Sequence, residues 1–581
     1  MPASKGNKRH ATPQSLNAAV KGICDIMRRS NCAGALQYVP ELTWILFLRI
    51  LDEREAHEAE AAEAVGAEFV PTLGAPYRWQ DWAAPGGAKR KALEDGKLGD
   101  LFNFLNGELL PHLRKLRDQP GATSRQRVVS ELMSGVERTR IDTERNFRDV
   151  LDKVDEIRAE AVDTTHVFTL SQVYEGLLLK MGERGNDGGQ FFTPREVIRA
   201  MIRVIDPQIG ETIYDPGCGT GGFLAQSFEH MAGPNNERIQ TGEQLETLRQ
   251  RTFYGREKDN AVYPIALANL VLHGIDEPHI WHGNTLTGQE TYGGLFESSP
   301  ALFDVVMSNP PFGGKEGAGA QTRFAYRTGA TQVLFLQHIL NSMAPTGRCG
   351  LVIDEGVLFR TNERAFVDTK RKLLNECDLW CIVSLPGGVF SAAGAGVKTN
   401  LLFFTRGKST ERIWYFDLSD QKTGKKTPFT LEKFADFFRL LPSRGDSERS
   451  WTVDIAARRQ QAKVDADAIR AQAAKPAAEL ARLEDELKAA KKAKRSEPEL
   501  AALKERAGVL AREVNELNGK AQAVEDAAFD LKAVNPNAKS MADTRTPGEL
   551  LEFIASKGKE VEAALAQLRE AAGNSSPNAT A

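Results

Sequence analysis

Between residues 189 and 420, short apolar runs rich in β-branched and aromatic residues alternate with segments of helical periodicity. The runs lie at 212–214, 252–254, 303–306, 350–353, 379–383, 401–404 and 413–416. Strands that alternate with helices form βαβ units, so this region predicts an α/β domain built on a mostly parallel sheet. The last two runs are too close together for a helical crossover, which favours antiparallel pairing of the final strands.

The segment before the sheet has a helical pattern. From Leu16 onward, apolar residues recur at i, i+4 and i+7, and comparable patterns continue to about residue 161. We therefore predict a helical domain over residues 12–165, in which Trp79 and Trp82 are core or hinge residues. The other divisions that we predict are a disordered tail over 1–11, the α/β domain over 166–420, a connecting segment over 421–459, a helical region over 460–572 and a disordered tail over 573–581.

The C-terminal helical region carries a heptad repeat. Apolar side chains follow a 3-4 spacing in two runs, which are Leu480, Leu483, Leu487 and Ala490, then Leu500, Leu503, Ala507, Leu510, Val514, Leu517, Ala521 and Val524. This spacing favours an antiparallel coiled-coil hairpin that turns near Pro498, with Pro476 as the first residue of its first helix. Residues 547–571 predict one more amphipathic helix. We expect this region to dock on a partner, the alternative being a solvated spacer.

Composition limits the classes of function. With a net charge of −3 and a pI of about 6.4, the 581-residue chain lacks the overall basic charge typical of nucleic-acid binding. Only a local basic surface, or a partner that supplies positive charge, is compatible with such a role. The six cysteines include no CxxC pair, which predicts reduced thiols and no metal site. Without a signal peptide or a long apolar run, we expect a cytoplasmic protein with no membrane partner.

The sequence Asn309, Pro310, Pro311, Phe312 follows the apolar run at 303–306. The carboxyl end of a parallel strand is where open α/β sheets bind ligands. Two prolines fix the backbone, so the Asn309 side chain and the Pro310 carbonyl offer two rigid acceptors beside an aromatic ring. Such a set suits a planar amine, for example the exocyclic N6 of adenine. A loop that merely contains two prolines is the alternative.

A glycine-rich loop joins an earlier strand to a helix. Its residues are Asp215, Pro216, Gly217, Cys218, Gly219, Thr220, Gly221, Gly222 and Phe223. The loop satisfies the GxGxxG pattern of dinucleotide sites, but the next acid at a strand end, Glu257, lies 35 residues beyond Gly222 instead of about 20. Asp215 suits the ammonium of an amino-acid ligand, and Glu257 suits a ribose diol. S-adenosylmethionine therefore fits better than NAD.

These motifs, in this order, resemble the gamma class of adenine-N6 DNA methyltransferases. Residues 385–390 (Leu-Pro-Gly-Gly-Val-Phe), residues 398–404 (Lys-Thr-Asn-Leu-Leu-Phe-Phe) and the helical N-terminal domain narrow the resemblance to the modification (methylase) subunit of Type I restriction–modification systems. The resemblance covers residues 12–420 and implies a Rossmann-like class I SAM-dependent methyltransferase sheet. An upstream segment is similar to the one that closes over the methionine part of the cofactor in that class: Gln190, Phe191, Phe192, Thr193 and Pro194.

The resemblance assigns roles to individual residues. It implies that Thr193 and the loop from Asp215 to Phe223 hold the methionine part of the cofactor, and that Glu257 binds the ribose. Asn284, with Thr285 and Leu286, stands where relatives often carry Asp beside the cofactor adenine, and its carbonyl is expected to accept from that amine. Asn309 and Pro310, with Pro311, accept from the target amine, Phe312 stacks on the flipped base, and Phe390 closes the other side of the base.

The loop from Gly313 to Thr331 carries Lys315, Arg323 and Arg327, for which DNA phosphate contacts and a mobile, solvated loop are equally compatible with the sequence. In the expected reaction, the acceptors favour a tetrahedral N6 whose lone pair faces the methyl donor. No covalent intermediate is required, and Cys218 is therefore expected to be a small loop residue.

The resemblance implies double-stranded DNA, a specificity subunit and a second copy of the chain as partners, and it leaves open whether a restriction nuclease subunit joins them. The sequence contains no segment typical of a DNA-recognition domain. Three alternatives remain: a self-sufficient adenine-N6 methyltransferase of another defence system, a methyltransferase acting on RNA or protein glutamine, and an NAD-dependent binding module. The long helical regions argue against the RNA or glutamine enzyme, and the position of Glu257 argues against NAD.

Overall fold

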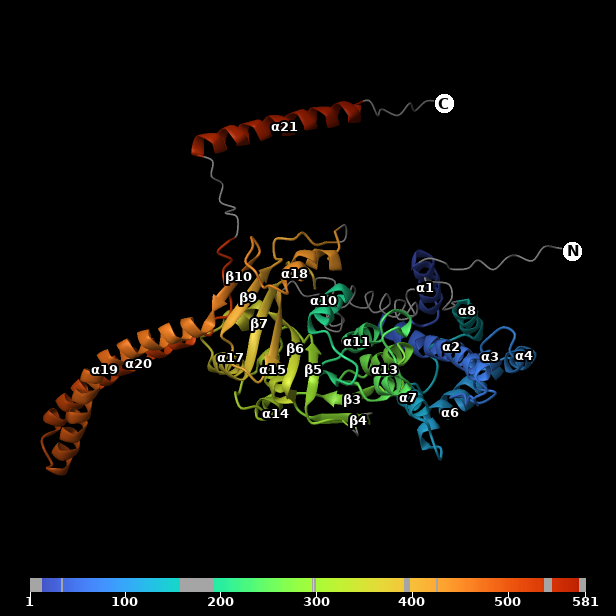
Figure 1. Cartoon of the computed structure of the whole chain (residues 1–581), viewed down its shortest axis with the longest axis horizontal. Coiled ribbons are helices and arrows are strands. Elements are labelled where there is room, and N and C mark those ends of the chain that lie inside the picture. Colours follow the sequence, from blue (N-terminus) through green and yellow to red (C-terminus); the bar gives the residue numbers. More distant parts are fainter. Residues whose placement is uncertain are drawn as a thin grey trace.

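The computed structural model describes residues 13–32, 35–156, 193–294, 296, 299–390, 398–424, 427–537 and 546–573 (Figure 1). The predicted disordered tail at 1–11 lies outside these ranges, as does the tail after residue 573. Three residues of the upstream cofactor segment, Gln190, Phe191 and Phe192, also lie outside them.

The centre of the molecule is a ten-stranded mixed sheet with the strand order β10-β9-β7-β8-β6-β5-β1-β2-β3-β4. Strands β1, β2, β3, β5 and β6 run parallel, and β9 runs parallel to β7. The strands are β1 (Ile213–Asp215), β2 (Phe253–Glu257), β3 (His279–Asn284), β4 (Gln289–Gly294), β5 (Phe303–Ser308), β6 (Met343–Asp354), β7 (Cys377–Ser384), β8 (Thr399–Arg406), β9 (Arg412–Asp417) and β10 (Ser450–Asp454). This is the predicted α/β class with a Rossmann-like sheet.

The pairing of the last strands differs from the prediction. Strand β8 does not pair with β9. It lies between β6 and β7 and runs antiparallel to both, while β9 pairs with β7. The reason is that β8 is buried along most of its length and so takes a central place, which sequence proximity cannot reveal. Strands β3, β4 and β10 were not predicted, because β3 contains two histidines and a glycine, and β4 and β10 are polar edge strands.

Strand order reverses between β1 and β5, the two neighbours at the centre of the sheet. The chain leaves β1 toward β2 on one side and returns to β5 on the other. At such a switch point, the loops that follow the two adjacent strands run to opposite sides. They leave a crevice at the carboxyl ends of those strands. The loops that begin at Asp215 and Asn309 are those two loops.

Helices cover both faces of the sheet (Figure 1). Apolar residues of α10, α11 and α13 share one buried cluster with the N-terminal helices, and those of α15 and α17 form the core of the opposite face. The helices of this domain are α10 (Arg195–Ile205), α11 (Gly222–Ala232), α12 (Gly242–Gln250), α13 (Val262–Leu272), α14 (Ala318–Gln321), α15 (Thr331–Ser342), α16 (Glu355–Phe359), α17 (Arg364–Glu376) and α18 (Ala435–Leu440), with 3-10 turns at Pro234–Asn236 and Leu431–Phe434.

The N-terminal domain is helical, as predicted. Trp79 and Trp82 are fully buried and pack edge-on against each other, which confirms their core role. The elements are α1 (Pro13–Arg28), α2 (Ala35–Ala64), α3 (Trp79–Trp82), α4 (Ala88–Glu94), α5 (Asp100–Phe104), a π-helical turn (Leu105–Leu109), α6 (Leu110–Arg114), a 3-10 turn (Leu116–Asp118), α7 (Ser124–Leu132) and α8 (Glu144–Asp155).

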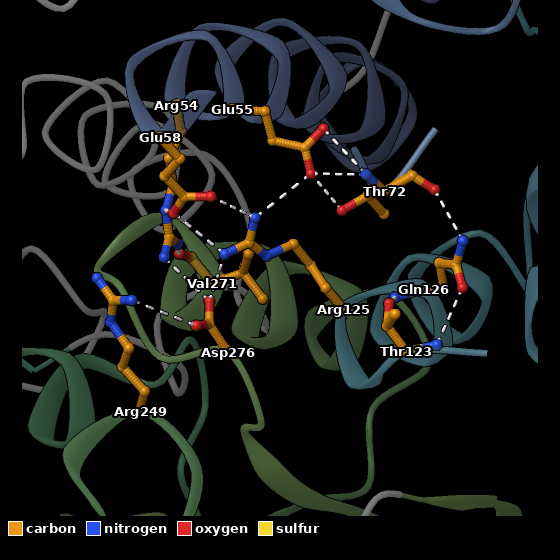
Figure 2. Close-up of polar contacts among 10 residues, drawn as sticks. All are labelled: Arg54, Glu55, Glu58, Thr72, Thr123, Arg125, Gln126, Arg249, Val271 and Asp276. Carbon is orange, nitrogen blue, oxygen red and sulfur yellow. Dashed lines mark hydrogen bonds and ion pairs between the residues drawn. The ribbon is translucent and has the colours of Figure 1, made fainter. Parts of the chain in front are cut away.

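Figure 2 shows a polar network that joins this domain to the sheet domain. Arg125 of α7 pairs with Glu58 of α2 at 2.8 Å and with Asp276, which lies between α13 and β3, at 3.0 Å. Arg54 of α2 pairs with Asp276 at 2.9 Å and donates to the carbonyl of Val271 at 2.7 Å. The helical domain is therefore tied to α13, which packs under the glycine-rich loop.

The C-terminal region contains the predicted antiparallel hairpin, formed by α19 (Ile455–Lys492) and α20 (Glu497–Ala527), which projects from the body (Figure 1). The prediction for Pro476 is wrong. The helix begins at Ile455, capped by Asp454, and Pro476 lies inside it. Heptad packing against α20 outweighs the one backbone hydrogen bond that a proline removes. The last helix, α21 (Pro547–Gly573), stands apart from the rest of the described chain.

Residues on both sides of the hairpin belong to the sheet domain. The segment 421–459, predicted as a connector, supplies α18 and the edge strand β10. After the hairpin the chain returns to the sheet, where Phe529 and Leu531 are buried and the Tyr415 hydroxyl donates to the Leu531 carbonyl at 2.9 Å. No described helix is long and apolar enough to cross a membrane.

Candidate active site

A cavity of about 330 Å³ lies at the switch point between β1 and β5. Its wall is formed by the loops that follow β1, β2, β3 and β5, with the start of α10 and α15. It includes Asn309 and Gly217–Thr220, so the two motifs singled out in the sequence border one space. The predicted site residues in the wall are Thr193, Asp215, Pro216, Gly217, Cys218, Gly219, Thr220, Gly222, Phe223, Glu257, Asn284, Thr285, Leu286, Asn309, Pro311, Phe312 and Lys315.

The glycine-rich loop turns tightly between β1 and α11. Gly221 has φ +79°, and a Cβ there would lie 3.2 Å from the Leu270 side chain of α13, so a larger residue would be strained. Asp215 is buried and accepts from Ser308 Oγ at 2.8 Å and from the Gly217 amide at 3.1 Å. Burial raises the pKa of Asp215 to about 7, although these two hydrogen bonds act to lower it. The loop therefore places a buried acid beside the cavity.

Glu257 ends β2, lines the cavity and contacts the glycine-rich loop. Its Oε2 accepts from the Gly219 amide at 3.0 Å, and its Oε1 accepts from the Asp259 amide at 2.7 Å. Burial raises the pKa of Glu257 to about 7, while the backbone donors oppose that shift. A carboxylate held in this way can accept from the two hydroxyls of a ribose. The thiol of Cys218 is also buried, which raises its pKa well above the ordinary value and makes it a poor nucleophile.

Asn284, at the end of β3, does not have the free oxygen that the prediction requires. Its Oδ1 accepts from the amides of Leu286 at 3.0 Å and Thr287 at 3.2 Å, so both lone pairs are used in the turn. The amide Nδ2 is the group left for a ligand. The next residue, Thr285, donates its hydroxyl to the Pro216 carbonyl at 2.6 Å and ties this turn to the glycine-rich loop.

Asn309 follows β5 and has one polar group without a partner. Its Nδ2 donates to Thr193 Oγ1 at 3.0 Å, while its Oδ1 is buried and has no hydrogen-bond partner in the described chain. The buried carbonyl of Pro310 accepts from Gln332 Nε2 at 3.4 Å, a long contact that leaves its second lone pair. An unsatisfied buried oxygen is costly, so its presence at the cavity indicates a ligand donor.

Phe312 lines the cavity, and the ring of Phe390 packs against it from outside the wall. Phe312 and Phe390 meet edge to face, with ring centroids 5.4 Å apart and an interplanar angle of 77°. Phe390 is buried and Phe312 is half-buried. The structure brings these two rings together although they are 78 residues apart, but they contact each other directly and do not flank a gap for a base, as the prediction for Phe390 requires.

The loop after Phe312 is fixed at its base. Lys315 pairs with Ala330 in an antiparallel bridge, and Glu316 accepts from Thr331 Oγ1 at 2.9 Å. Arg323 and Arg327 are both exposed residues, but only Arg323 has hydrogen bonds within the described chain. The loop is therefore ordered by its own contacts.

Comparison with known proteins identifies the family. The N-6 DNA Methylase family matches residues 165–473, more than half of the chain, and the HsdM N-terminal domain matches residues 16–154. The Type I restriction enzyme EcoEI methylase subunit of Escherichia coli is 34% identical over 460 residues, which cover 76% of this chain and 87% of that subunit. The chain belongs to the family of Type I restriction enzyme methylase subunits. It is accordingly an adenine-specific DNA methyltransferase.

Solved structures agree with this membership. A modification subunit from Vibrio vulnificus YJ016 is similar with a TM-score of 0.66 and 32% identity, over 77% of this chain and 93% of that one. A chain from a type I R-M system studied for complex assembly and conformational transition gives a TM-score of 0.62 and 31% identity, over 97% of this chain and 100% of that one. The latter match includes the C-terminal helices of this methylase subunit.

Sequence reasoning missed several residues that shape the methylase site. Ser308 holds Asp215, and Gln332 contacts Pro310 while its Oε1 accepts from the Asp354 amide at 3.1 Å. The available signal was a polar residue at the buried end of an apolar strand, and another at the start of an apolar helix. Neither signal says which loop the side chain will meet.

Proposed function

We propose that this methylase subunit uses S-adenosylmethionine to methylate N6 of an adenine rotated out of double-stranded DNA. The unpartnered, buried Oδ1 of Asn309 in the same cavity as Asp215 and Glu257 is the observation that carries the proposal. The donor set suits this cofactor: an acid for its ammonium at the β1 loop and a carboxylate for its ribose at the end of β2. When bound, S-adenosylmethionine supplies an electrophilic methyl group.

Residues of the chain itself activate the target amine. The N6 lone pair of adenine is conjugated with the ring, so the amine is a weak nucleophile until its nitrogen becomes tetrahedral. Asn309 Oδ1 and the free lone pair of the Pro310 carbonyl accept the two N–H groups and stabilise the positive charge that develops on nitrogen. After methyl transfer, the excess proton leaves to solvent. No side chain has to form a covalent bond.

Phe312 and Phe390 supply the base site. A base leaves the duplex at a cost of about a few kcal/mol, and stacking on an aromatic ring returns about 1–3 kcal/mol. The two rings contact each other edge to face, so the proposal assigns the stacking contact with the base to Phe312, and Phe390 supports that ring from the side. Lys315 and Arg327, on the fixed loop beside it, are suited to phosphate contacts.

Substitution at the acceptor tests the proposal. Asn309→Ala should lower kcat about 10²–10³-fold, the usual loss for one donor or acceptor that acts on developing charge, with the dissociation constant for S-adenosylmethionine nearly unchanged. Phe312→Ala should raise the KM for DNA and lower kcat, also without loss of cofactor. Methylation of duplex DNA by either variant near the parent rate would refute this site.

The proposal extends to the partners. The exposed face of α21 carries apolar residues at coiled-coil spacing: Leu551, Ile554, Val561, Leu565 and Leu568. We propose that this stripe docks on a helix of a specificity subunit, which also brings in a second methylase copy. Deleting 546–581 leaves Phe529 and Leu531 in the core, so the variant should fold and bind cofactor but fail to form the complex in size-exclusion chromatography. Sequence-specific methylation by the single chain would instead favour a self-sufficient enzyme.

A further inference from the structure

For Arg323 the sequence left DNA phosphate contact and a solvated loop as alternatives, but its guanidinium contacts the turn that follows β3. Nη1 donates to the carbonyl of Leu286 at 3.0 Å and lies 3.5 Å from the carbonyl of Thr285. Both residues line the cavity in the turn that follows β3. Because one charged nitrogen reaches two successive backbone carbonyls, it holds both peptide groups of the turn toward the same point.

Close packing supports the same contact. Gly288 has φ +68°, and a Cβ built there would lie 2.5 Å from Arg323 Nη1 and 2.8 Å from Cζ, so the guanidinium covers this glycine. Below it, Leu286 shares a small buried cluster with Ala320 and Phe335, and Phe324 packs against that cluster. Polar and apolar contacts therefore join the segment 318–324 to the turn at 285–288.

The turn is joined to the glycine-rich loop in its own right. Thr285 Oγ1 donates to the Pro216 carbonyl at 2.6 Å, and Asn284 Oδ1 closes the turn from inside. Arg323 holds the outside of the same turn. The segment that follows Phe312 is in this way connected, through Arg323 and Thr285, to both loops that border the cofactor side of the cavity.

Arg327 provides the contrast within one loop. It is exposed like Arg323, and it forms no hydrogen bond or ion pair with any residue that the structure describes. The two arginines, four residues apart, therefore differ in their contacts. One is engaged with the chain, and the other is available to a ligand.

We infer that Arg323 is a positioning residue for the cofactor: it holds the turn 284–288 in the form that receives the adenosine part of S-adenosylmethionine. The inference rests on the proposed cofactor and adds a residue to its site. Removing the guanidinium frees the Leu286 and Thr285 carbonyls and loosens the turn, so the cost falls on cofactor binding and not on the methyl transfer step.

The test compares Arg323→Ala and Arg323→Lys with Arg327→Ala in the full chain. Titration calorimetry with S-adenosylmethionine should show a dissociation constant raised about tenfold for Arg323→Ala, the loss expected for one charge-assisted hydrogen bond, and raised less for Arg323→Lys. Arg327→Ala should stay within about twofold. The ligand 5′-methylthioadenosine, which lacks the amino-acid part, should show the same ranking because the turn is assigned to the adenosine end.

Kinetics of the complex with its specificity subunit separate positioning from general damage. Arg323→Ala should raise the KM for S-adenosylmethionine about tenfold and leave kcat at saturating cofactor within about twofold. Arg327→Ala should affect only the KM for DNA. Parent-like cofactor affinity in Arg323→Ala, or a fall in kcat at unchanged KM, would overturn the inference. Failure of the parent chain to bind S-adenosylmethionine would overturn the proposed function itself and this inference with it.

Discussion

Replacing Arg125 with Met should loosen the joint between the helical domain and the sheet domain. The change removes the guanidinium that pairs with Glu58 at 2.8 Å and with Asp276 at 3.0 Å, while it keeps a side chain of similar length. The Arg125 side chain is 15% exposed, Asp276 16% and Glu58 26%. Breaking a fully buried pair costs about 3–5 kcal/mol and an exposed one about 0–1 kcal/mol. Because these groups are mostly buried, we expect Arg125→Met to lower the local stability of this joint by about 2–3 kcal/mol.

Hydrogen–deuterium exchange measures this loss locally, which matters because a multidomain chain has no single free energy of unfolding. Amides of α7 and α13 should exchange about 30–150-fold faster in Arg125→Met, since each 1.4 kcal/mol is a factor of ten. Arg78→Met is the matched control. Among the residues that the structure describes, Arg78 pairs only with Asp81, three residues away on the same side of the joint. Its loss should change exchange about fivefold at most.

The pH dependence follows from Glu58. Burial alone would raise its pKa, but the hydrogen bond from Arg125 and the charge of Arg54 lower the pKa below the ordinary value. A lowered folded-state pKa gives stability that is fully present above the unfolded pKa of about 4.3 and is lost as the pH falls through the folded value. The effect of Arg125→Met, corrected for intrinsic exchange, should therefore be equal at pH 6 and pH 8. Unchanged exchange in α7 and α13, or an equal effect of Arg78→Met, would refute the reasoning.

Three further outcomes are expected. Because the raised pKa values of Glu257 and Asp215 are both about 7, the parent should bind S-adenosylmethionine several-fold more weakly at pH 6 than at pH 8 in calorimetry. Glu257→Gln should bind weakly and keep only the part of the pH dependence that Asp215 supplies, whereas a profile as steep as the parent's would exclude Glu257 as the ribose ligand. Gln332→Glu keeps an acceptor for the Asp354 amide but loses the donor to Pro310, so it should lower kcat more than cofactor affinity, and equal losses in both would point to general damage. Leu483 is buried in the hairpin, so Leu483→Ala should destabilise the hairpin by about 2–3 kcal/mol, whereas Leu483→Met should be nearly neutral. The measurement is the loss of helix content of α19 and α20 on heating.

The motifs of the site could be found from the sequence because each depends on local rules. The glycine-rich loop needs positive φ and close approach at Gly221, and the acceptors of Asn309 and Pro310 need a rigid backbone after a buried strand. The heptad spacing of α19 and α20 likewise predicts that these two helices pack against each other. The place of Pro476 was misjudged because local helix rules ignore the packing that stabilises a long helix.

Contacts between distant segments could not be found in this way. The sequence does not say that Gln332 will meet Pro310, or that Thr193 will receive a hydrogen bond from Asn309 across 116 residues. Nor does it separate Arg323 from Arg327, since both are arginines in one glycine-containing loop. The turn at Asn284 is a similar case, because only its geometry shows that both oxygen lone pairs are taken.

By itself the sequence determined the class of the sheet, the helical domains on either side, the loops that border the cavity and the chemistry that those loops can support. These follow from periodicity and from backbone rules that act over a few residues. Tertiary structure alone decided the central position of β8, the meeting of Phe312 with Phe390 and the contact of Arg323 with the turn after β3. Strand order and side-chain partners depend on how whole elements exclude water together, and that free energy is shared among residues far apart in the chain.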